Sequence, residues 1–202
     1  MTELPRLRTS TSYRLTEPVM RFLVKTHITP TTLTWLGFSV ALSAAIVIAT
    51  GHLFVAGFIV LAGGFFDMLD GALARQTGKV TTLGALLDST LDRVSEAVLL
   101  LGILIFYLFL GGQPVVGIVL VCLALISSMM VSYLRARGEA LGLECGVGLF
   151  TRPERVIALA IGLLASGVVD SALIISLAVI VVFSFATAGQ RLLHLRRQIK
   201  NK

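Results

Sequence analysis

The chain has 202 residues, of which 56% are hydrophobic and only 14% are charged, and its mean hydropathy is +0.93. This composition excludes a soluble domain with a solvated surface and is typical of an integral membrane protein. The net charge of +6 comes from 17 Lys and Arg against 11 Asp and Glu. In so apolar a chain the placement of the charges matters more than their sum, and we expect no nucleic-acid partner.

Residues 1–28 are predicted to form an N-terminal juxtamembrane segment. They contain no apolar stretch followed by a small-residue cleavage site, so we expect no signal peptide and a cytoplasmic N-terminus. Within the stretch YRLTEPVMRFLVKT, residues 13–26, apolar and basic side chains fall on different helix faces, which predicts an amphipathic helix on the membrane surface. Thr29 and Pro30 then supply an N-cap and a first-turn proline for the first span.

Residues 29–202 are predicted to form one domain of six transmembrane helices. The apolar segments lie at about 31–50, 53–74, 82–110, 115–136, 153–169 and 171–190. The links at 51–52, 111–114 and 169–170 contain no Lys or Arg, and all 17 basic residues lie near the opposite ends of the spans. The positive-inside rule makes those ends cytoplasmic. We therefore predict an all-α integral protein of the cytoplasmic membrane with both termini in the cytoplasm.

Four carboxylates interrupt the apolar pattern where the second and third spans approach the cytoplasmic side. Asp67 and Asp70 are spaced i,i+3, and Asp88 and Asp92 are spaced i,i+4, so each pair lies on one helix face. Four uncompensated carboxylates would cost on the order of 10 kcal/mol inside a membrane. Clustered oxygen ligands suit Mg²⁺ or Mn²⁺, as one ion or as a pair. Two adjacent helices are thus predicted to share a metal site that faces the cytoplasm.

Small and basic residues accompany these carboxylates. Gly71, Ala74 and Gly84 lie on or beside the aspartate faces, where they leave room for a ligand to approach the backbone and the metal. Arg75 follows Gly71 by one turn and is placed to meet phosphate oxygens. Any one of these charges could be an ordinary interfacial residue at a span end. The whole set together indicates a binding site.

The stretch from Asp67 to Asp92 reads D-x2-D-G-x2-A-R-x8-G-x3-D-x3-D, and without departure it resembles the signature of the CDP-alcohol phosphatidyltransferases. This resemblance implies an enzyme that displaces CMP from a CDP-linked lipid, usually CDP-diacylglycerol, with an alcohol hydroxyl. It implies that Asp67, Asp70 and Asp88 bind metal and that Asp92 both contacts the metal and acts as the general base. Gly71, Arg75 and Thr81 match positions that contact CDP. We expect two Mg²⁺ ions as the cofactor, with Mn²⁺ as the alternative.

The acceptor alcohol has to be inferred outside this signature. Three arginines at the cytoplasmic ends of the last spans would suit a doubly charged phosphate, although membrane topology alone also favours arginine there. The stretches SYLRARGEALG and RPER, with TPTTLT and GHLF, resemble the phosphatidylinositol-phosphate synthases of actinobacteria and their archaeal relatives. The resemblance implies inositol 1-phosphate as the acceptor, bound by Ser132, Arg135, Arg155 and Arg191. It also places Thr31, Thr32 and Thr34 near the nucleotide.

Arg135 stands where the actinobacterial pattern has Lys, so acceptor preference is expected to differ there. The nearest alternative is a phosphatidylglycerophosphate synthase, whose acceptor, glycerol 3-phosphate, also carries a phosphate but whose segment after the fourth span differs. A cation transporter is the alternative from another class, because carboxylates inside a membrane also mark ion pathways. The resemblance alone implies a homodimer.

Overall fold

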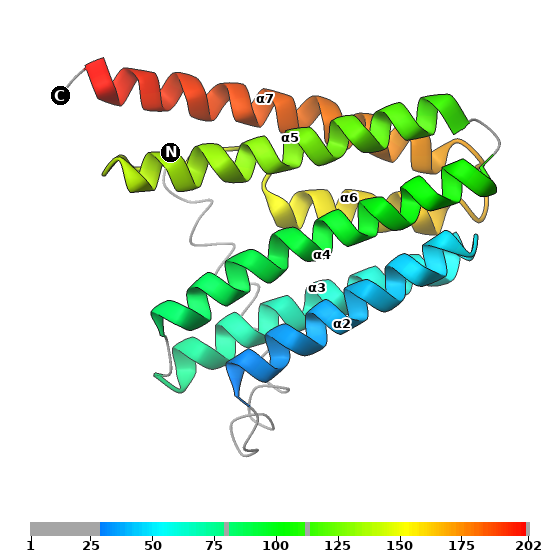
Figure 1. The fold of residues 1–202 in the computed structure, drawn as a ribbon, viewed down its shortest axis with the longest axis horizontal. Helices are drawn as coiled ribbons and strands as arrows, with labels where there is room; N and C mark the ends of the chain where they lie inside the picture. The colour runs from blue at the N-terminus through cyan, green and yellow to red at the C-terminus, as the bar shows by residue number, and fades with distance from the viewer. Residues whose placement is uncertain (1–28, 79–80, 112–113, 201–202) are drawn as a thin grey trace.

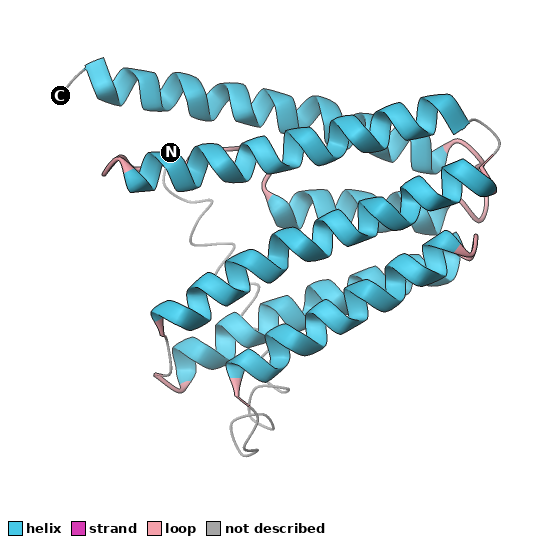
Figure 2. Ribbon diagram, in the orientation of Figure 1, coloured by secondary structure: helices cyan, strands magenta, loops and turns pink. Residues whose placement is uncertain are grey.

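The computed structural model describes residues 29–78, 81–111 and 114–200, so the predicted surface helix within 1–28 lies outside the described residues. Every regular element in the described ranges is a helix, which confirms the all-α prediction for this part (Figures 1 and 2). The helices are α2 (Pro30–Ala49), α3 (Leu53–Gln76), α4 (Thr82–Phe109), α5 (Pro114–Ala140), α6 (Arg152–Ala165) and α7 (Ala172–Lys200).

The observed helices follow the predicted apolar segments, with the largest differences in the last two. Helix α6 ends at Ala165, where Ser166 caps it and a turn leads to α7. Helix α7 continues ten residues beyond the predicted apolar segment, because this polar stretch contains the good helix formers Leu, Arg, Gln and Lys. As a consequence, Arg191 lies within α7 and does not close it.

Among the described helices, α2, α3, α5 and α7 are long and apolar enough to cross a membrane. Helix α4 has 28 residues, but charged side chains occupy much of its first half. Helix α6 has only 14 residues, which span about 21 Å at 1.5 Å per residue and fall short of a hydrocarbon core of about 30 Å. The chain is a membrane protein, whereas the count of six spans and the cytoplasmic termini stay predictions.

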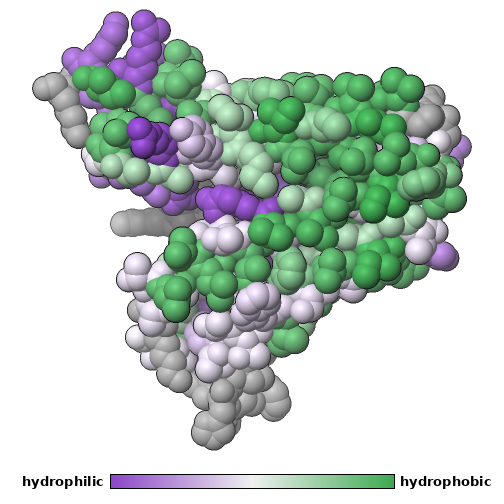
Figure 3. Space-filling model, viewed as in Figure 1, coloured by the Kyte–Doolittle hydropathy of each residue, from purple (hydrophilic) through white to green (hydrophobic). Residues whose placement is uncertain are grey.

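The short helix α6 joins two groups of longer helices. Helix α2 packs against α3 and α4, α5 packs against α7, and α6 contacts both α3 and α7. In Figure 1, α6 begins part of the way along the bundle, so its first turn lies inside the molecule. Figure 3 shows a hollow between the two groups at the end where the last turns of α7 project, with hydrophilic residues gathered in it.

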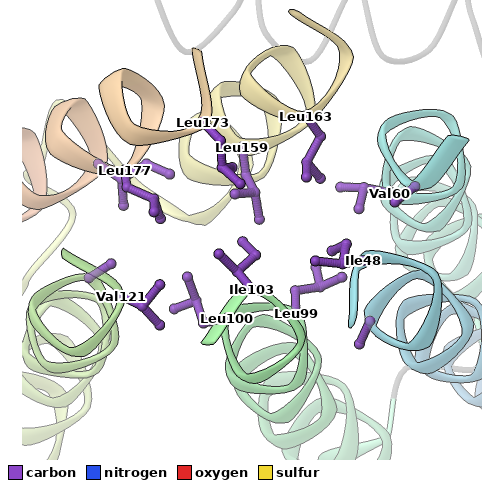
Figure 4. Packing of buried hydrophobic residues seen from close by; sticks show 14 of the residues in the cluster. Ile48, Val60, Leu99, Leu100, Ile103, Val121, Leu159, Leu163, Leu173 and Leu177 are labelled. Carbon is purple, nitrogen blue, oxygen red and sulfur yellow. The ribbon is translucent and has the colours of Figure 1, made fainter. Parts of the chain in front are cut away.

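The apolar core lies toward the other end of the bundle from this hollow and packs the helices against one another. Side chains from all six described helices point into it (Figure 4), among them Ile48, Val60, Ile103, Val121, Leu163 and Leu177. Helices α2 and α4 approach each other closely at Gly102, where an added Cβ would lie 2.5 Å from the carbonyl oxygen of Ala45. This contact holds the second half of α4 against the second half of α2.

Many large apolar side chains face outward. Ile46, Phe58, Leu108 and Val182 are each more than half exposed, and hydrophobic residues cover most of the face in Figure 3 away from the hollow. Contiguous apolar surface on this scale would promote aggregation in water. It is the surface expected of helices that are surrounded by lipid.

Candidate functional site

The four signature carboxylates lie on two helices that are consecutive in the chain. Asp67 and Asp70 are near the end of α3, and Asp88 and Asp92 are near the start of α4. Only five residues separate the two helices, so the four side chains are brought to one end of the bundle. Asp88 is repelled by the charge of Asp67, and Asp70 by that of Asp88. The predicted acidic cluster is therefore one electrostatic unit.

One arginine joins the two helices across this cluster. Nη1 of Arg152, in the first turn of α6, contacts Oδ2 of Asp67 and lies 2.7 Å from Oδ1 of Asp92. A single nitrogen atom thus neutralises part of the charge on both helices. Arg152 was not among the site residues predicted from the sequence. Its position in the RPER stretch, three residues before Arg155, was the signal that could have found it.

The residues of the cluster fit a hard divalent cation by the type of donor they offer. In the part of the chain that the structure describes, no three acidic, His or Cys side chains are gathered closely enough to form a ready ligand set, and Arg152 pairs with two of the four carboxylates. Asp70 is only 4% exposed, however, and its Oδ2 has no hydrogen-bond partner. An added Cβ at Gly37 would lie 3.1 Å from Oδ1 of Asp67, so this glycine leaves room beside that carboxylate. A buried carboxylate oxygen without a donor is stabilised by a cation.

A cavity of about 510 Å³ opens beside these carboxylates. Helices α2, α3 and α4 and the residues just before α2 and α4 all contribute to its lining, which consists of Thr29, Pro30, Thr31, Thr34, Asp70, Gly71, Ala74, Arg75, Thr81, Gly84, Ala85 and Asp88. The structure therefore brings all but one of the predicted nucleotide-contacting residues to one cavity. The exception is Thr32, whose hydroxyl lies 2.9 Å from that of Thr29, outside the lining.

Local backbone chemistry shapes the mouth of this cavity. Thr29 and Thr81 cap α2 and α4, and the Thr81 hydroxyl accepts the N–H of Gly84 at 3.0 Å. An added Cβ at Gly84 would lie 2.9 Å from that same hydroxyl oxygen, so the cap and the cavity both depend on this glycine. The Arg75 guanidinium lies over Gly71, with Nη1 3.3 Å from the position of an added Cβ. Both glycines keep the cavity wall close to the backbone.

The predicted acceptor-binding residues come from three further helices and differ in burial. Ser132 and Arg135 lie on α5, and the exposed Arg135 pairs with Glu139 at 2.9 Å. Arg191 of α7 is 3% exposed and donates hydrogen bonds to the carbonyl oxygens of Val131 and Val147, at 2.5 and 2.9 Å. Arg135 lies near enough for its charge to repel Arg191. Arg191 therefore also fastens the segment between α5 and α6.

Arg155 of α6 is the most buried of the predicted acceptor residues, with 2% exposure. Its Nε and Nη2 donate to Oε1 and Oε2 of Glu96, at 2.5 and 2.7 Å. Glu96 was also absent from the predicted site residues. It follows Asp92 at the i,i+4 spacing and so continues the acidic face of α4 by one turn, which was a readable signal.

Comparison with known proteins places this site in context. The family model for CDP-alcohol phosphatidyltransferases matches residues 27–187. An archaetidylinositol phosphate synthase of Methanothermobacter thermautotrophicus is 39% identical over 173 residues, which cover 83% of each chain. A phosphatidylinositol phosphate synthase of Mycobacterium tuberculosis is 37% identical over 201 residues, which cover 95% of this chain and 90% of that one.

Solved structures of the M. tuberculosis phosphatidylinositol phosphate synthase also match. The crystal structure with CDP-DAG bound superposes with a TM-score of 0.82 at 34% identity and covers 90% of this chain and 94% of that one. The structure in complex with manganese and citrate gives a TM-score of 0.81 at 33% identity and covers 88% and 87% of the two chains.

Proposed function

The chain belongs to the CDP-alcohol phosphatidyltransferase family, and from this premise we propose that it transfers a phosphatidyl group from CDP-diacylglycerol to inositol 1-phosphate. The products are phosphatidylinositol phosphate and CMP. The observation that carries the proposal is the cavity of about 510 Å³, because one wall combines two signature carboxylates with the glycines and Arg75 that are expected to meet the nucleotide. The names and bound CDP-DAG of the matched relatives support the same substrates.

Divalent metal, most simply two Mg²⁺ ions, would be held by Asp67, Asp70, Asp88 and Asp92. The oxygen-only donor set and the unpartnered Oδ2 of Asp70 support this assignment, as does the manganese complex of the M. tuberculosis relative. When bound, the metal stabilises the charge on the attacking oxygen and on the leaving phosphate.

The CDP-lipid would occupy the cavity with its phosphates toward the carboxylates. Arg75 would bind phosphate oxygens, while Gly71, Ala74 and Gly84 leave room for the nucleotide. The Thr81 hydroxyl already accepts a hydrogen bond from Gly84. The threonines at the start of α2, Thr31, Thr32 and Thr34, would lie near the nucleotide, with Thr31 and Thr34 lining the cavity.

Asp92 would act as the general base. Its carboxylate would take the proton from the inositol hydroxyl as that oxygen forms a bond to the phosphatidyl phosphorus, and the bond from this phosphorus to the CMP oxygen would break. The side chain is mostly buried, with an exposed fraction of 26%. On α4 it lies one turn beyond Asp88 and one turn before Glu96, which pairs with Arg155.

The acceptor phosphate would be bound by Ser132, Arg135, Arg155 and Arg191. These residues come from α5 and α7, on the other side of the hollow in Figure 3 from the carboxylate-bearing helices, and from α6, which joins the two groups. Guanidinium groups bind a doubly charged phosphate bidentately. Serine or choline acceptors, which lack a phosphate, would give no role to this set of arginines.

The membrane arrangement that accompanies this function has six spans, with the active site and both termini on the cytoplasmic side of the cytoplasmic membrane. The placement of all 17 basic residues supports it. We also propose a homodimer, as implied by the family.

The experiment that tests the function is a transfer assay on the full chain in lipid vesicles with CDP-diacylglycerol and Mg²⁺. CMP and a new phospholipid should form when inositol 1-phosphate is added. If they form with glycerol 3-phosphate and not with inositol 1-phosphate, the acceptor assignment is wrong and the chain is a phosphatidylglycerophosphate synthase. If no acceptor releases CMP and the vesicles instead take up Mg²⁺, the transporter alternative holds.

Arg135 offers a test of the acceptor pocket that leaves the buried interior intact. We expect Arg135→Ala to raise the KM for inositol 1-phosphate by about tenfold or more, because a hydrogen bond to a charged group contributes about 1.5–3 kcal/mol. The KM for CDP-diacylglycerol should stay within twofold. Arg137→Ala is the matched control, since Arg137 is equally exposed in the last turn of the same helix. Equal shifts in both KM values would remove Arg135 from the pocket.

A further inference from the structure

Glu96 and Arg155 form a buried ion pair beside the proposed acceptor site. The pair joins α4 to the first turn of α6 through two parallel hydrogen bonds of 2.5 and 2.7 Å. Arg155 is 2% exposed and Glu96 is 9% exposed. Burying two charges costs several kcal/mol per ion before their attraction is counted, so such a pair adds little to stability relative to apolar packing. The pair therefore calls for a role other than stability.

Two of the three guanidinium nitrogens of Arg155 are hydrogen-bonded and the third is not. Nε and Nη2 both donate to Glu96, while Nη1 is buried and has no hydrogen-bond partner among the described residues. A buried donor left unpaired is costly, and more so when it is charged. The two hydrogen bonds to Glu96 fix the plane of the guanidinium and hence the direction of its Nη1–H bonds.

We propose that Glu96 is a positioning residue: it holds the Arg155 guanidinium so that Nη1 donates to the phosphate of the acceptor. This inference rests on the proposed function and adds to it a residue outside the family signature. Glu96 lies one turn beyond Asp92 on α4. The helix that carries the general base therefore also sets the orientation of the acceptor's phosphate, which keeps the distance between base and acceptor fixed.

A positioning role and a purely electrostatic role for Glu96 predict different effects of its substitution on acceptor binding. If Glu96 acted only through its charge, it would repel the acceptor phosphate, and Glu96→Gln would tighten binding while Glu96→Asp would leave it unchanged. If Glu96 positions Arg155, both substitutions weaken binding. Gln sets an NH₂ group against Nη2, and Asp is one methylene too short to hold both nitrogens.

The test measures binding of inositol 1-phosphate by calorimetry, with the full chain in nanodiscs that contain CDP-diacylglycerol and Mg²⁺. We expect Glu96→Gln and Glu96→Asp each to raise the Kd by about tenfold or more, with the Kd for CDP-diacylglycerol unchanged. Glu144→Gln, the same substitution at an exposed glutamate, should change neither. A tighter Kd for Glu96→Gln, or an unchanged Kd for both variants, would overturn the proposal.

A double substitution separates positioning from loss of folding. In Glu96→Gln/Arg155→Gln both charges are removed together, which is commonly tolerated in buried pairs, whereas Arg155→Gln alone leaves Glu96 unpaired. The double variant should bind the acceptor as weakly as Arg155→Gln, because Glu96 acts only through Arg155. A further loss in the double variant would contradict this. If the wild type binds glycerol 3-phosphate in place of inositol 1-phosphate, the acceptor assignment fails, and the same comparison with that ligand still decides the role of Glu96.

Discussion

Asp92→Asn is expected to lower the rate of CMP release by about 10²–10⁴-fold, the usual contribution of a positioned general base, while CDP-diacylglycerol still binds. An amide has nearly the shape of the carboxylate but does not accept the proton of the attacking hydroxyl. The CDP-lipid cavity is lined by Asp70 and Asp88, and Asp92 is not among its lining residues. Turnover and lipid binding should therefore separate in this variant. The measurements are CMP release and equilibrium binding of CDP-diacylglycerol in vesicles.

Asp170→Asn provides the matched control for this prediction. Asp170 is exposed in the turn between α6 and α7, far along the chain from the acidic cluster, and the same chemical change there should leave both measurements unaltered. Retention of more than about a tenth of the wild-type rate by Asp92→Asn would rule out its assignment as the base, because even a modest general base contributes more than that. The proton would then have to be taken by another group of the cluster.

The acidic cluster and the cavity beside it could be predicted because their determinants are local. The i,i+3 and i,i+4 spacings place each aspartate pair on one helix face, and a short link makes the two helices neighbours. The predicted positions of Gly71, Arg75 and Thr81 around one ligand follow from the same two helices, and the cavity lined by all three agrees with them. The helix limits followed hydropathy to within four residues, except where polar helix formers extended α7.

The contacts of the basic residues could not be predicted, because they depend on how distant helices pack. Arg152 and Arg155 reach the acidic face of α4 only because α6 begins inside the bundle. Arg191 donates to carbonyl groups that are 44 and 60 residues away in the chain. The positive-inside pattern predicts on which side such arginines lie, but carries no information on their partners.

Asp70→Asn is expected to abolish transfer and yet to leave the protein as stable as the wild type, or more stable, when metal is removed. Asp70 is 4% exposed, and within the described part of the chain its Oδ2 lacks a hydrogen-bond partner. A buried carboxylate oxygen without a donor is costly, and an amide of the same shape costs less because it carries no charge. In chelator the apparent melting temperature should therefore stay level or rise, by about 2–4 °C for each kcal/mol gained.

Added metal should reverse the order of the melting temperatures of Asp70→Asn and the wild type. A ligand that binds only the folded state raises its stability by mass action, so Mn²⁺ or Mg²⁺ should raise the melting temperature of the wild type and of Asp170→Asn, and that of Asp70→Asn much less. The melting temperatures of Asp70→Asn and of the wild type, plotted against metal concentration, should therefore cross. If Asp70→Asn melts well below the wild type in chelator, the charge of this carboxylate stabilises the fold without metal, and the loss of activity would say nothing about metal. If it responds to metal as the wild type does, Asp70 is not a ligand. A crossing would show that the fold tolerates an unfavourable buried charge because the bound cation stabilises it.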